Sequence, residues 1–411
     1  MRLLFLMPEA YPTFRPDITE LFGKYLPRQG LMSDLVGYRA AEDSAVPAWG
    51  GGEVLLGPPP VGRLRKMPAR LLHFLTMLLR SRRELHEAIQ VRDMPMLAAF
   101  ALLRARLAGQ PFVYWMSFPV PEMEMRMARE LRWRGGNLLK YLMLALRSRI
   151  GYASLYRLVL PLADHIFVQS DAMAESLAAK GIARERMTAV PMCVDLDAFP
   201  QDTAWAPPVG QPFTMAYLGT CEKARRVDFL FEVLANLRAT GRDIRLLLVG
   251  DAWLPEEQVW LRKAAADLGV AEAVTITGWL QPAEARRRLL EADLAVSIVP
   301  PDPLLDVASP TKLVEYLALG IPVVANHHPD QSEVLAESGA GLSAAFEVAP
   351  FAAAVARMLD DRIMSAAMAK RGPGYVRLHR NYDTTARRLA PIYHGLTQPR
   401  GRVQLRSQSE T

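Results

Sequence analysis

The chain has little cysteine and no long apolar segment. Its only two cysteines, Cys193 and Cys221, lie far apart and show no metal-ligand spacing, which argues against a disulfide framework and a zinc site. No run approaches the ~18 consecutive apolar residues that a membrane span needs. The apolar run at the start meets Pro8, Glu9 and Arg15 at once, unlike a signal peptide. We therefore expect a cytoplasmic protein that is not integral to a membrane.

The excess of positive charge is small for a chain of this length. The formal net charge is +6, from 49 Lys and Arg against 43 Asp and Glu, and it does not indicate a nucleic-acid partner. Basic residues gather in 63–92 and in 123–160, each with eight Lys or Arg against two Glu. Leu, Met, Trp and Tyr accompany them, as in helices that lie on an anionic membrane surface. Ordinary surface helices packed on a sheet would look the same, so both interpretations stay open.

Predicted strands and helices alternate along the chain in two runs. The expected strands are 3–7, 34–38, 53–56, 88–92, 112–116, 165–169, 187–190, 213–218, 244–249, 273–276, 294–299 and 322–325. The expected helices are 17–30, 71–88, 95–107, 137–160 with a break near Gly151, 171–180, 227–239, 255–268, 282–291, 310–319, 331–337, 351–359, 363–371 and 384–393. This alternation predicts two α/β domains, each a parallel sheet covered by helices, with a ligand cleft between the carboxyl ends of their strands.

A segment rich in proline and glycine separates the two runs. Three prolines and one glycine fall within 201–212, which we interpret as a linker. The first domain is then expected at 1–200 and the second at 213–380. The polar residues 397–411 are expected to form a disordered tail.

The segment 309–326, SPTKLVEYLALGIPVVAN, has the residue types of a nucleotide site. Ser309 is a suitable N-cap, and Pro310 fits the first helical turn. Free N–H groups at this helix start suit a diphosphate. Lys312 lies in the same turn beside the phosphates, and Glu315, on nearly the same face, suits ribose hydroxyls. A capped amphipathic helix with a surface Lys–Glu pair fits the spacing equally well.

This segment resembles the donor-binding signature of retaining glycosyltransferases of family 4, also called glycosyltransferase group 1. These enzymes have the GT-B fold, two facing Rossmann-like domains with a cleft between them. The resemblance implies that Glu315 holds the ribose, and that Ser309, Pro310 and the backbone of Thr311–Leu313 hold the diphosphate. It also implies a nucleotide diphosphate sugar of UDP or GDP type as donor, a glycan or lipid-linked acceptor, and neither a metal nor another cofactor.

The segment 215–230, MAYLGTCEKARRVDFL, resembles the first strand, loop and helix of the family's donor domain. Gly219 matches the family's glycine, whereas Thr220 stands where the family has arginine. Arg225 aligns best with the family's lysine. The resemblance implies catalytic, phosphate-neutralising roles for Lys223, Arg225 and Lys312, and donor binding by Gly219, Thr220 and Arg226. A basic loop that caps a helix is the alternative.

Shorter pieces extend the resemblance to residues 1–20 and 160–345. They are LLLVGD at 246–251, TGWL at 277–280, LADHIFVQS at 162–170 and AVPMCVD at 189–195. From them the resemblance implies that Gly250, Trp279 and Leu280 line the nucleoside pocket. It also implies that a last helix, 381–396, crosses back to the first domain, which binds the acceptor.

The sequence departs from the family in two places. The family's first glutamate, eight positions before the second, is Val307 here, with Asp306 as the neighbouring substitute. The histidine that many members carry after the strand at 112–116 is missing, and Ser117 or Glu122 takes that area. We name no general base, because transfer on one face of the sugar lets the leaving diphosphate take the acceptor proton.

The loop EAYPTFRPD at 9–17 has aromatic residues where the family often has glycines. Tyr11, Phe14 and Arg15 suit a sugar ring or an acceptor phosphate, and we group them with Ser117 as acceptor-binding residues. A rigid proline turn is the alternative.

We predict a retaining hexosyltransferase of exopolysaccharide or surface-glycan synthesis, cytoplasmic or peripheral on the inner face of the plasma membrane. Two other functions stay open. A GT-B sugar epimerase would need carboxylates and a histidine around the sugar, a pattern that this sequence does not show. A partner subunit that binds nucleotide sugar without transfer fits the missing glutamate and histidine.

Overall fold

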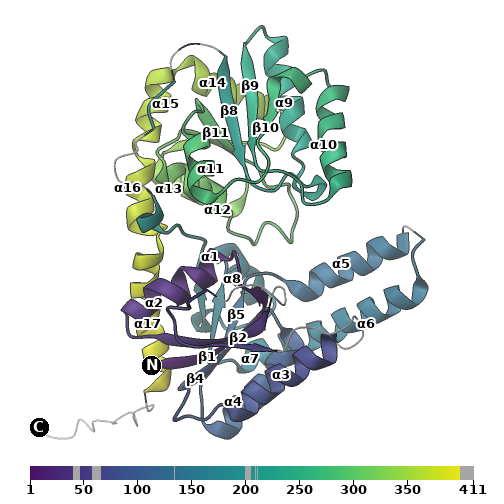
Figure 1. The fold of residues 1–411 in the computed structure, drawn as a ribbon, viewed down its shortest axis with the longest axis vertical. Helices are drawn as coiled ribbons and strands as arrows, with labels where there is room; N and C mark the ends of the chain where they lie inside the picture. Colours follow the sequence, from purple (N-terminus) through teal and green to yellow (C-terminus); the bar gives the residue numbers. More distant parts are fainter. Residues whose placement is uncertain are drawn as a thin grey trace, which may run out of the picture.

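The computed structural model describes residues 1–39, 47–57, 66–133, 135–199, 205–208, 210 and 212–398. Two parallel sheets, each covered by helices, lie one beyond the other along the long axis of the molecule (Figure 1). The expectation of two α/β units with parallel sheets is therefore confirmed.

The first sheet has seven strands in the order β3-β2-β1-β4-β5-β6-β7. They are β1 (Arg2–Tyr11), β2 (Met32–Arg39), β3 (Val54–Gly57), β4 (Ala88–Arg92), β5 (Phe112–Met116), β6 (His165–Val168) and β7 (Met187–Ala189). The helices around them are α1 (Pro16–Thr19), α2 (Leu26–Arg28), α3 (Lys66–Arg80), α4 (Pro95–Ala108), α5 (Val120–Trp133), α6 (Leu138–Ala153), α7 (Leu160–Leu162) and α8 (Asp171–Ala178). Two π-helical segments, η1 (Leu21–Tyr25) and η2 (Ser154–Val159), join α1 to α2 and α6 to α7.

The second sheet has six strands in the order β10-β9-β8-β11-β12-β13. They are β8 (Phe213–Leu218), β9 (Ile244–Val249), β10 (Val274–Ile276), β11 (Leu294–Ser297), β12 (Val323–Asn326) and β13 (Gly341–Ala344). The helices are α9 (Asp228–Ala239), α10 (Pro255–Asp267), α11 (Pro282–Leu289), α12 (Thr311–Ala318), α13 (Pro329–Ser338), α14 (Val348–Asp360), α15 (Arg362–Ala369), α16 (Gly372–His379) and α17 (Tyr382–Thr397).

Alternating side chains of the buried strands build a core on each face of the first sheet. Leu4 and Leu6 of β1 pack into the cluster under α4, whereas Leu3 and Phe5 pack into the opposite cluster, which includes α17. Because both faces are covered, β1 is apolar at every position from Leu3 to Met7, as in other parallel sheets, and all five residues of β4 are buried, Gln90 and Arg92 included.

Each sheet reverses its winding direction at one point, and the two points face each other. In the first sheet the reversal falls between β1 and β4, and in the second between β8 and β11. Loops at the carboxyl ends of strands diverge at such points and leave a crevice. The loops after these four strands therefore position the candidate site.

Helix α17 returns from the second half of the chain to the first. Asn381 caps it by accepting a hydrogen bond from the N–H of Thr384 at 2.9 Å. Leu389 and Tyr393 are buried in the cluster that contains Phe22 of η1. The helix therefore packs along the first sheet, as Figure 1 shows in yellow.

Several elements differ from the sequence prediction. The helix expected at 71–88 ends at Arg80, and α5, β13 and α16 were not expected. The break expected near Gly151 is absent, because α6 continues to Ala153, and the atoms nearest to where a Cβ of Gly151 would stand, in Pro121 and Pro95, are at the ordinary contact distances of 3.7 and 4.0 Å. Much of the expected linker (201–204, 209 and 211) and most of the expected tail (399–411) lie outside the described residues.

Candidate functional site

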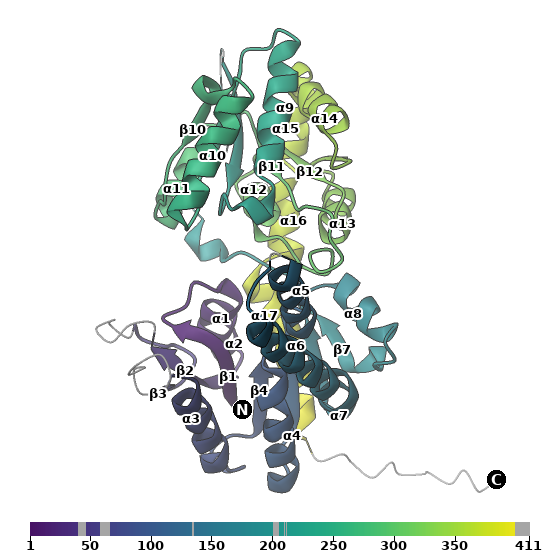
Figure 2. The ribbon, with the colours of Figure 1, turned by 90° about the vertical axis from the view of Figure 1, so that its right-hand side faces the viewer.

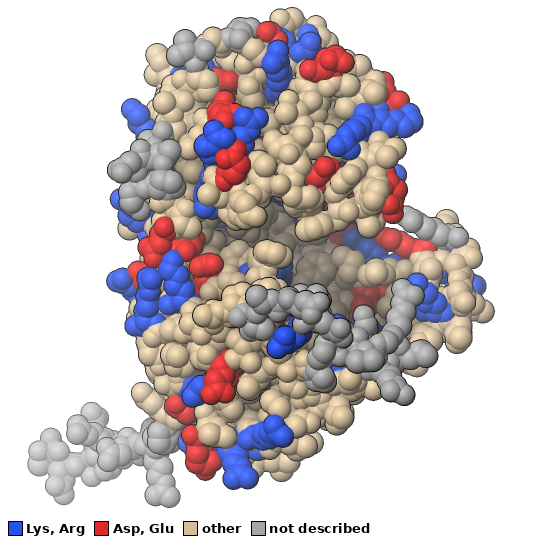
Figure 3. Space-filling view, in the orientation of Figure 1, with Lys and Arg blue, Asp and Glu red and all other residues tan. Residues whose placement is uncertain are grey.

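A cleft of ≈ 650 Å³ lies between the two sheets, at the carboxyl ends of their strands. Figure 3 shows the surface hollowed between the two halves. The first half contributes Arg15, Ser117, Phe118, Met123, Arg126, Gln169 and Met192 to its lining. The second contributes Leu218, Gly219, Thr220, Glu222, Ala224, Arg225, Val299, Asp302, Leu305, Ala308, Ser309, Pro310, Thr311, Lys312 and Glu315.

A smaller compartment of ≈ 220 Å³ adjoins the cleft within the second half. The two share Leu218, Gly219 and Glu315, and the small one is also lined by Val249, Gly250, Trp279, Leu280, Pro282, Ala285 and Arg286. Trp279 stacks on Trp253 with ring centroids 4.1 Å apart. The compartment thus offers an aromatic edge and a guanidinium, and Glu315 stands where it meets the larger cleft.

Helix α12 places Lys312 and Glu315 on the floor of the cleft. Leu313, Val314 and Leu317 bury its opposite face in the core of the second half. The Tyr316 hydroxyl accepts a hydrogen bond from the N–H of Leu218 at 2.7 Å and so fixes the helix against the end of β8. The amphipathic pattern therefore orients the helix so that its polar turn faces the cleft.

Neither of these two side chains has an ionic partner within 4.0 Å among the described residues. Burial, and to a smaller extent the charge of Arg225, lowers the pKa of Lys312 to about 8. Burial raises the pKa of Glu315 to about 7, although Arg286 and Lys312 act against it. Ionised groups without partners in such surroundings are costly, and they are typical of ligand sites.

Two glycines shape the wall opposite α12. Gly219 and Gly250 have φ of +134° and +139°, values that side-chain-bearing residues rarely adopt. A Cβ on Gly250 would stand 2.1 Å from the carbonyl oxygen of Gly219, and a Cβ on Gly219 would stand 3.2 Å from Cε of Lys312. Only glycine therefore allows the β8 and β9 loops to close over the lysine.

Of the three basic residues expected in the β8–α9 loop, only Arg225 lines the cleft. The Lys223 ammonium instead lies 5.7 Å from the ring centroid of Trp260 on α10. Arg226 donates to Asp228 at 3.2 Å, beside its own helix start. The positive charge that the second half brings to the cleft therefore comes from Arg225 and Lys312.

The prediction that Ser309 caps α12 is wrong. Pro310 is the N-cap residue, and no side chain of the described residues caps the helix. The Ser309 hydroxyl donates to Asp330 at 3.0 Å and accepts from the N–H of Met192 at 3.0 Å. It therefore joins the two halves beneath the cleft, where Asp330 also pairs with Arg380 at 2.8 Å.

On the first half, Ser117 lies within a buried network of charged groups. Its hydroxyl donates to Asp93 and accepts from Arg15 at 3.1 Å and from Arg92 at 3.0 Å. Burial raises the pKa of Asp93, although Arg92 and Ser117 act against it. Asp93 also has a φ of +47°, a strained value for a residue with a side chain. The network fixes Arg15 and Ser117 at the cleft wall.

The two aromatic residues expected at the acceptor side do not line the cleft. Tyr11 is buried in the core, where its hydroxyl donates to the carbonyl of Pro47 at 3.1 Å. Phe14 is 95% exposed and lies outside the cleft lining. Packing of the loop after β1 directs Arg15, and not the rings, toward the cleft.

The acidic side chain of the loop after β11 that reaches the cleft is not the expected Asp306. Asp302 lines the cleft, whereas Asp306 does not. Val307 packs against the first half, and its carbonyl accepts from Ser170 at 2.6 Å. Asp302 pairs across the cleft with Arg126 of α5, with Nη2 to Oδ1 at 2.7 Å.

Sequence reasoning missed four residues at the site: Asp93, Arg126, Arg286 and Asp302. Asp93 directly follows β4 and so stands at the same sheet edge as Ser117, which is a signal that the strand pattern contained. Asp302 has a weaker form of the same signal, because it lies in the loop after β11. Arg126 and Arg286 have no such signal, because α5 and α11 reach the cavities through tertiary packing.

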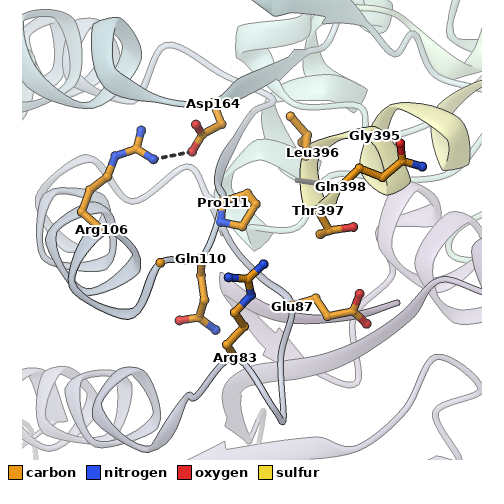
Figure 4. Close-up of a pocket in the computed structure, with 11 residues that line it drawn as sticks. Arg83, Glu87, Arg106, Gln110, Pro111, Asp164, Gly395, Leu396, Thr397 and Gln398 are labelled. Atoms are coloured by element: carbon orange, nitrogen blue, oxygen red, sulfur yellow. Dashed lines mark hydrogen bonds and ion pairs between the residues drawn. The ribbon is translucent and has the colours of Figure 1, made fainter. Parts of the chain in front are cut away.

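A separate hollow of ≈ 420 Å³ lies at the opposite, amino-terminal ends of the strands of the first sheet (Figure 4). Arg83, Glu87, Arg106 and Asp164 surround it, and Arg106 pairs with Asp164 at 2.7 Å. It lies at the edge of the sheet opposite to the crevice, and we assign it no function.

A metal site is not apparent in the described part of the chain, where no three His, Cys, Asp or Glu side chains converge. An Asp-x-Asp pair, Asp195 and Asp197, is engaged by Lys24 at 2.6 and 3.0 Å. Its carboxylates therefore serve a salt-bridge network rather than the cleft.

Sequence models of two glycosyltransferase families match the chain, one in each half. The Glycosyl transferase 4-like domain matches residues 18–193, and Glycosyl transferases group 1 matches residues 212–361. Residues 18–193 and 212–361 thus resemble these two glycosyltransferase domains.

Individual proteins agree with this assignment. The chain is 29% identical over 215 residues to the GDP-mannose-dependent alpha-(1-6)-phosphatidylinositol monomannoside mannosyltransferase of Mycobacterium tuberculosis, which is 50% of this chain and 55% of that protein. The chain thus spans about half the length of this curated relative. The structure resembles Anabaena Alr3699/HepE in complex with UDP (15% identity, TM-score 0.67, covering 96% of this chain and 100% of that one). It also resembles WaaG, a glycosyltransferase involved in lipopolysaccharide biosynthesis (16%, 0.65, 96% and 100%). The fold is GT-B.

Replacing Lys312 should stabilise the protein in the absence of ligand. Because burial lowers its folded-state pKa to about 8 from the ordinary 10.5, its charge destabilises the fold at neutral pH. We expect Lys312→Met to raise the free energy of unfolding by ~1–3 kcal/mol at pH 7. The gain should shrink as the pH rises from 8 toward 10.5, where the lysine loses its charge in the unfolded chain as well.

Urea unfolding over this pH range measures the effect. Lys263→Met, which removes an exposed lysine from α10, is the control and should change stability little. A destabilised Lys312→Met protein would show that Lys312 has a structural partner.

Proposed function

We propose that the protein is a retaining glycosyltransferase that moves a sugar from a nucleotide diphosphate sugar to a glycan or lipid-linked acceptor. In this proposal residues 213–380 bind the donor, and residues 1–200 together with α17 bind the acceptor. The observation that carries it is the pair Lys312 and Glu315, two ionisable side chains that line the cleft at the carboxyl edge of the second sheet and have no ion-pair partner among the described residues. The only ring contact of the Lys312 ammonium in the described part of the chain is with Tyr217, whose ring centroid is 4.9 Å away.

The shape of the second half suits a nucleoside diphosphate. The small compartment takes the base beside Trp279 and Leu280, with Arg286 facing its edge. Glu315, shared by both compartments, accepts hydrogen bonds from the ribose hydroxyls. The diphosphate then lies at the start of α12, where Thr311 and Leu313 offer backbone N–H groups and Lys312 and Arg225 offer charge.

Transfer follows from positioning and electrostatics in this proposal. Arg225 and Lys312 stabilise the charge that develops on the leaving diphosphate. The acceptor hydroxyl approaches on the face that the diphosphate leaves, so that a diphosphate oxygen takes its proton and the sugar keeps its configuration. Binding both substrates in one cleft supplies the rest of the rate acceleration, because it holds the reacting atoms close together and correctly oriented. Lys223 and Arg226 lie outside the cleft and support the loop rather than the phosphates.

The names of similar proteins support a GDP or UDP sugar as the proposed donor. The mycobacterial relative is named for GDP-mannose, and the Anabaena structure contains UDP. Arg286 offers two parallel N–H donors, which match the O6 and N7 acceptors of guanine and also suit the carbonyl oxygens of uracil. We therefore keep both GDP and UDP sugars as donors.

The acceptor side is formed by Arg15 and Ser117, held by Arg92 and Asp93. An arginine with a neighbouring hydroxyl suits a hydroxyl-rich or phosphorylated acceptor. A glycan or lipid-linked acceptor of exopolysaccharide or surface-glycan assembly fits this chemistry.

Contact with an anionic membrane is part of the proposal. In helices α3 and α4 and in the stretch 138–162, the sequence has nine Lys or Arg and no Asp or Glu. These elements lie on one side of the molecule, which faces the viewer in Figure 2. No helix of the described residues is long and apolar enough to cross a bilayer.

The same side carries large exposed apolar side chains at helical spacing. They are Leu71, Leu72 and Leu79 of α3, Met96, Phe100, Leu103 and Leu107 of α4, and Leu138, Leu139, Leu142, Met143, Leu146 and Ile150 of α6. We call this surface the basic apolar face. Such a combination favours an anionic bilayer, because self-association would bring like charges together.

Glu315→Ala should abolish donor use while the protein stays folded. Two hydrogen bonds from ribose to a charged group are worth ~3–6 kcal/mol, so donor affinity should fall by about 100-fold or more. In the wild type, UDP or GDP at ~100 times its dissociation constant should add ~2.7 kcal/mol of stability, measured by thermal unfolding.

Glu256→Ala, an exposed residue of α10, is the matched control and should keep the response. With donor and acceptor together, proton NMR of the product should show the donor's anomeric configuration. Epimerised donor without acceptor, or binding without product, would instead indicate the epimerase or the partner subunit. Unchanged binding in Glu315→Ala would contradict the ribose site.

The basic apolar face should bind vesicles that contain about one fifth phosphatidylglycerol and not vesicles of pure phosphatidylcholine. Leu142→Asp with Leu146→Asp should weaken this binding by about tenfold, because charged groups do not enter the interface. Val259→Asp with Ile363→Asp, at exposed positions of the second half, is the control in co-sedimentation. Equal sedimentation of all three proteins would contradict the membrane contact.

A further inference from the structure

A third hollow, of ≈ 630 Å³, lies beside the donor cleft and is lined by arginines. Its residues are Pro121, Glu122, Met125, Arg126, Arg129, Ser148, Arg149, Tyr152, Ala153, Arg157, Pro303 and Leu304. We call it the arginine hollow. Both halves of the molecule contribute to it, because Pro303 and Leu304 belong to the loop after β11.

The helix α5 presents different sides to the two cavities. Glu122, Met125, Arg126 and Arg129 follow the i, i+3, i+4, i+7 spacing of one helix face. Met123 and Arg126 line the donor cleft, so Arg126 stands at the boundary between the cavities. A molecule in the arginine hollow therefore lies one side chain away from the donor cleft.

Two of the charged groups in the hollow are already neutralised. Arg126 pairs with Asp302, and Glu122 accepts from Lys180 at 2.9 Å and from the Tyr156 hydroxyl at 2.6 Å. Neither pair leaves a free charge for a ligand.

The other three arginines have no such partner. The side chains of Arg129, Arg149 and Arg157 are exposed, and their guanidinium groups make no hydrogen bond or ion pair with the described residues. Glu130, the neighbour of Arg129, lines neither cavity. The hollow therefore holds three uncompensated positive charges within one concave surface.

The surroundings indicate where the matching anion comes from. Arg149 lies on α6 next to Ile150 and three residues from Leu146, both of which belong to the basic apolar face. Guanidinium groups bind phosphate oxygens in a bidentate way, and several of them suit a phosphate with two charges. A phosphate at the surface of a bilayer would meet the hollow when the apolar face is docked.

We propose that the arginine hollow binds the phosphate or diphosphate of a lipid acceptor embedded in the bilayer, while the acceptor hydroxyl reaches the donor cleft past Arg126. This rests on the proposed glycosyl transfer and membrane contact. It gives Arg129, Arg149 and Arg157 the role of acceptor-binding residues.

Vesicles with two headgroups of equal total charge test the proposal. Phosphatidic acid presents a phosphomonoester and phosphatidylglycerol a phosphodiester, each in phosphatidylcholine at matched surface potential. The wild type should bind the phosphatidic acid vesicles about tenfold more tightly. The variant Arg129→Gln/Arg149→Gln/Arg157→Gln should bind both vesicles alike.

A control variant removes the same charge from the basic apolar face outside the hollow. Arg80→Gln/Arg104→Gln/Lys140→Gln, at basic positions of α3, α4 and α6, should weaken binding to both vesicles and keep the preference. The response of thermal stability to nucleoside diphosphate should stay unchanged in the hollow variant, which shows that its fold and donor site are intact.

Four results would overturn the proposal. Wild-type binding without a headgroup preference, or a preference that survives in the hollow variant, would remove the phosphate site and leave the membrane contact standing. A preference abolished by millimolar inorganic phosphate would indicate a site for free phosphate. Absence of any vesicle binding by the wild type would instead contradict the membrane contact itself.

Discussion

Lys312 and Glu315 stand within one turn of α12, surrounded by protein and without an ionic partner among the described residues. Folding alone gives no reason to keep two such groups, because each would be more stable paired or exposed to water. Their environment is built around them: Tyr316 ties the helix to β8, and Gly219 and Gly250 let two loops close over the lysine. A ligand that brings an anion and hydroxyl groups resolves both charges at once.

The same helix start depends on contacts between the two halves. Ser309 bonds to the backbone of Met192 and to Asp330, Ser170 bonds to the carbonyl of Val307, and Arg126 pairs with Asp302. Together with α17, these contacts define how far Arg15 and Ser117 on one wall of the cleft stand from Lys312 and Glu315 on the other. A cleft in which positioning supplies much of the rate needs such a fixed separation.

The strand–helix alternation was sufficient to predict every strand of the two sheets except β13, since buried parallel strands are apolar on both faces. Of the two helices that were not expected, α5 contains the run Glu122-Met-Glu-Met-Arg-Met127, which alternates with the period of a strand and hides the helix. At the site, spacing alone placed Lys312 and Glu315 on one face. The spacing could not show that Lys312 and Glu315 lack ionic partners, because the tertiary packing of the other elements decides which charged groups lie near them.

Other site residues show the same limit. Ser309 has the chemistry of an N-cap, but its hydroxyl accepts a hydrogen bond from the N–H of Met192, which is distant in the sequence. Asp306 and Asp302 lie in one loop, and only the folded loop shows which of the two faces the cleft. Tyr11 and Phe14 have the residue types of an acceptor site, yet Tyr11 is buried in the core and Phe14 is exposed to solvent.

The uptake of a proton when the nucleoside diphosphate binds tests the central claim most directly. At pH 8.5 the phosphates are fully ionised, and Lys312, with a pKa of about 8, is mostly neutral. Bringing a diphosphate beside it should restore its charge with uptake of about three quarters of a proton. Isothermal titration in two buffers of different ionisation enthalpy measures this number. We expect this uptake in the wild type and none in Lys312→Met; binding to the wild type without proton uptake would show that Lys312 does not meet the phosphates.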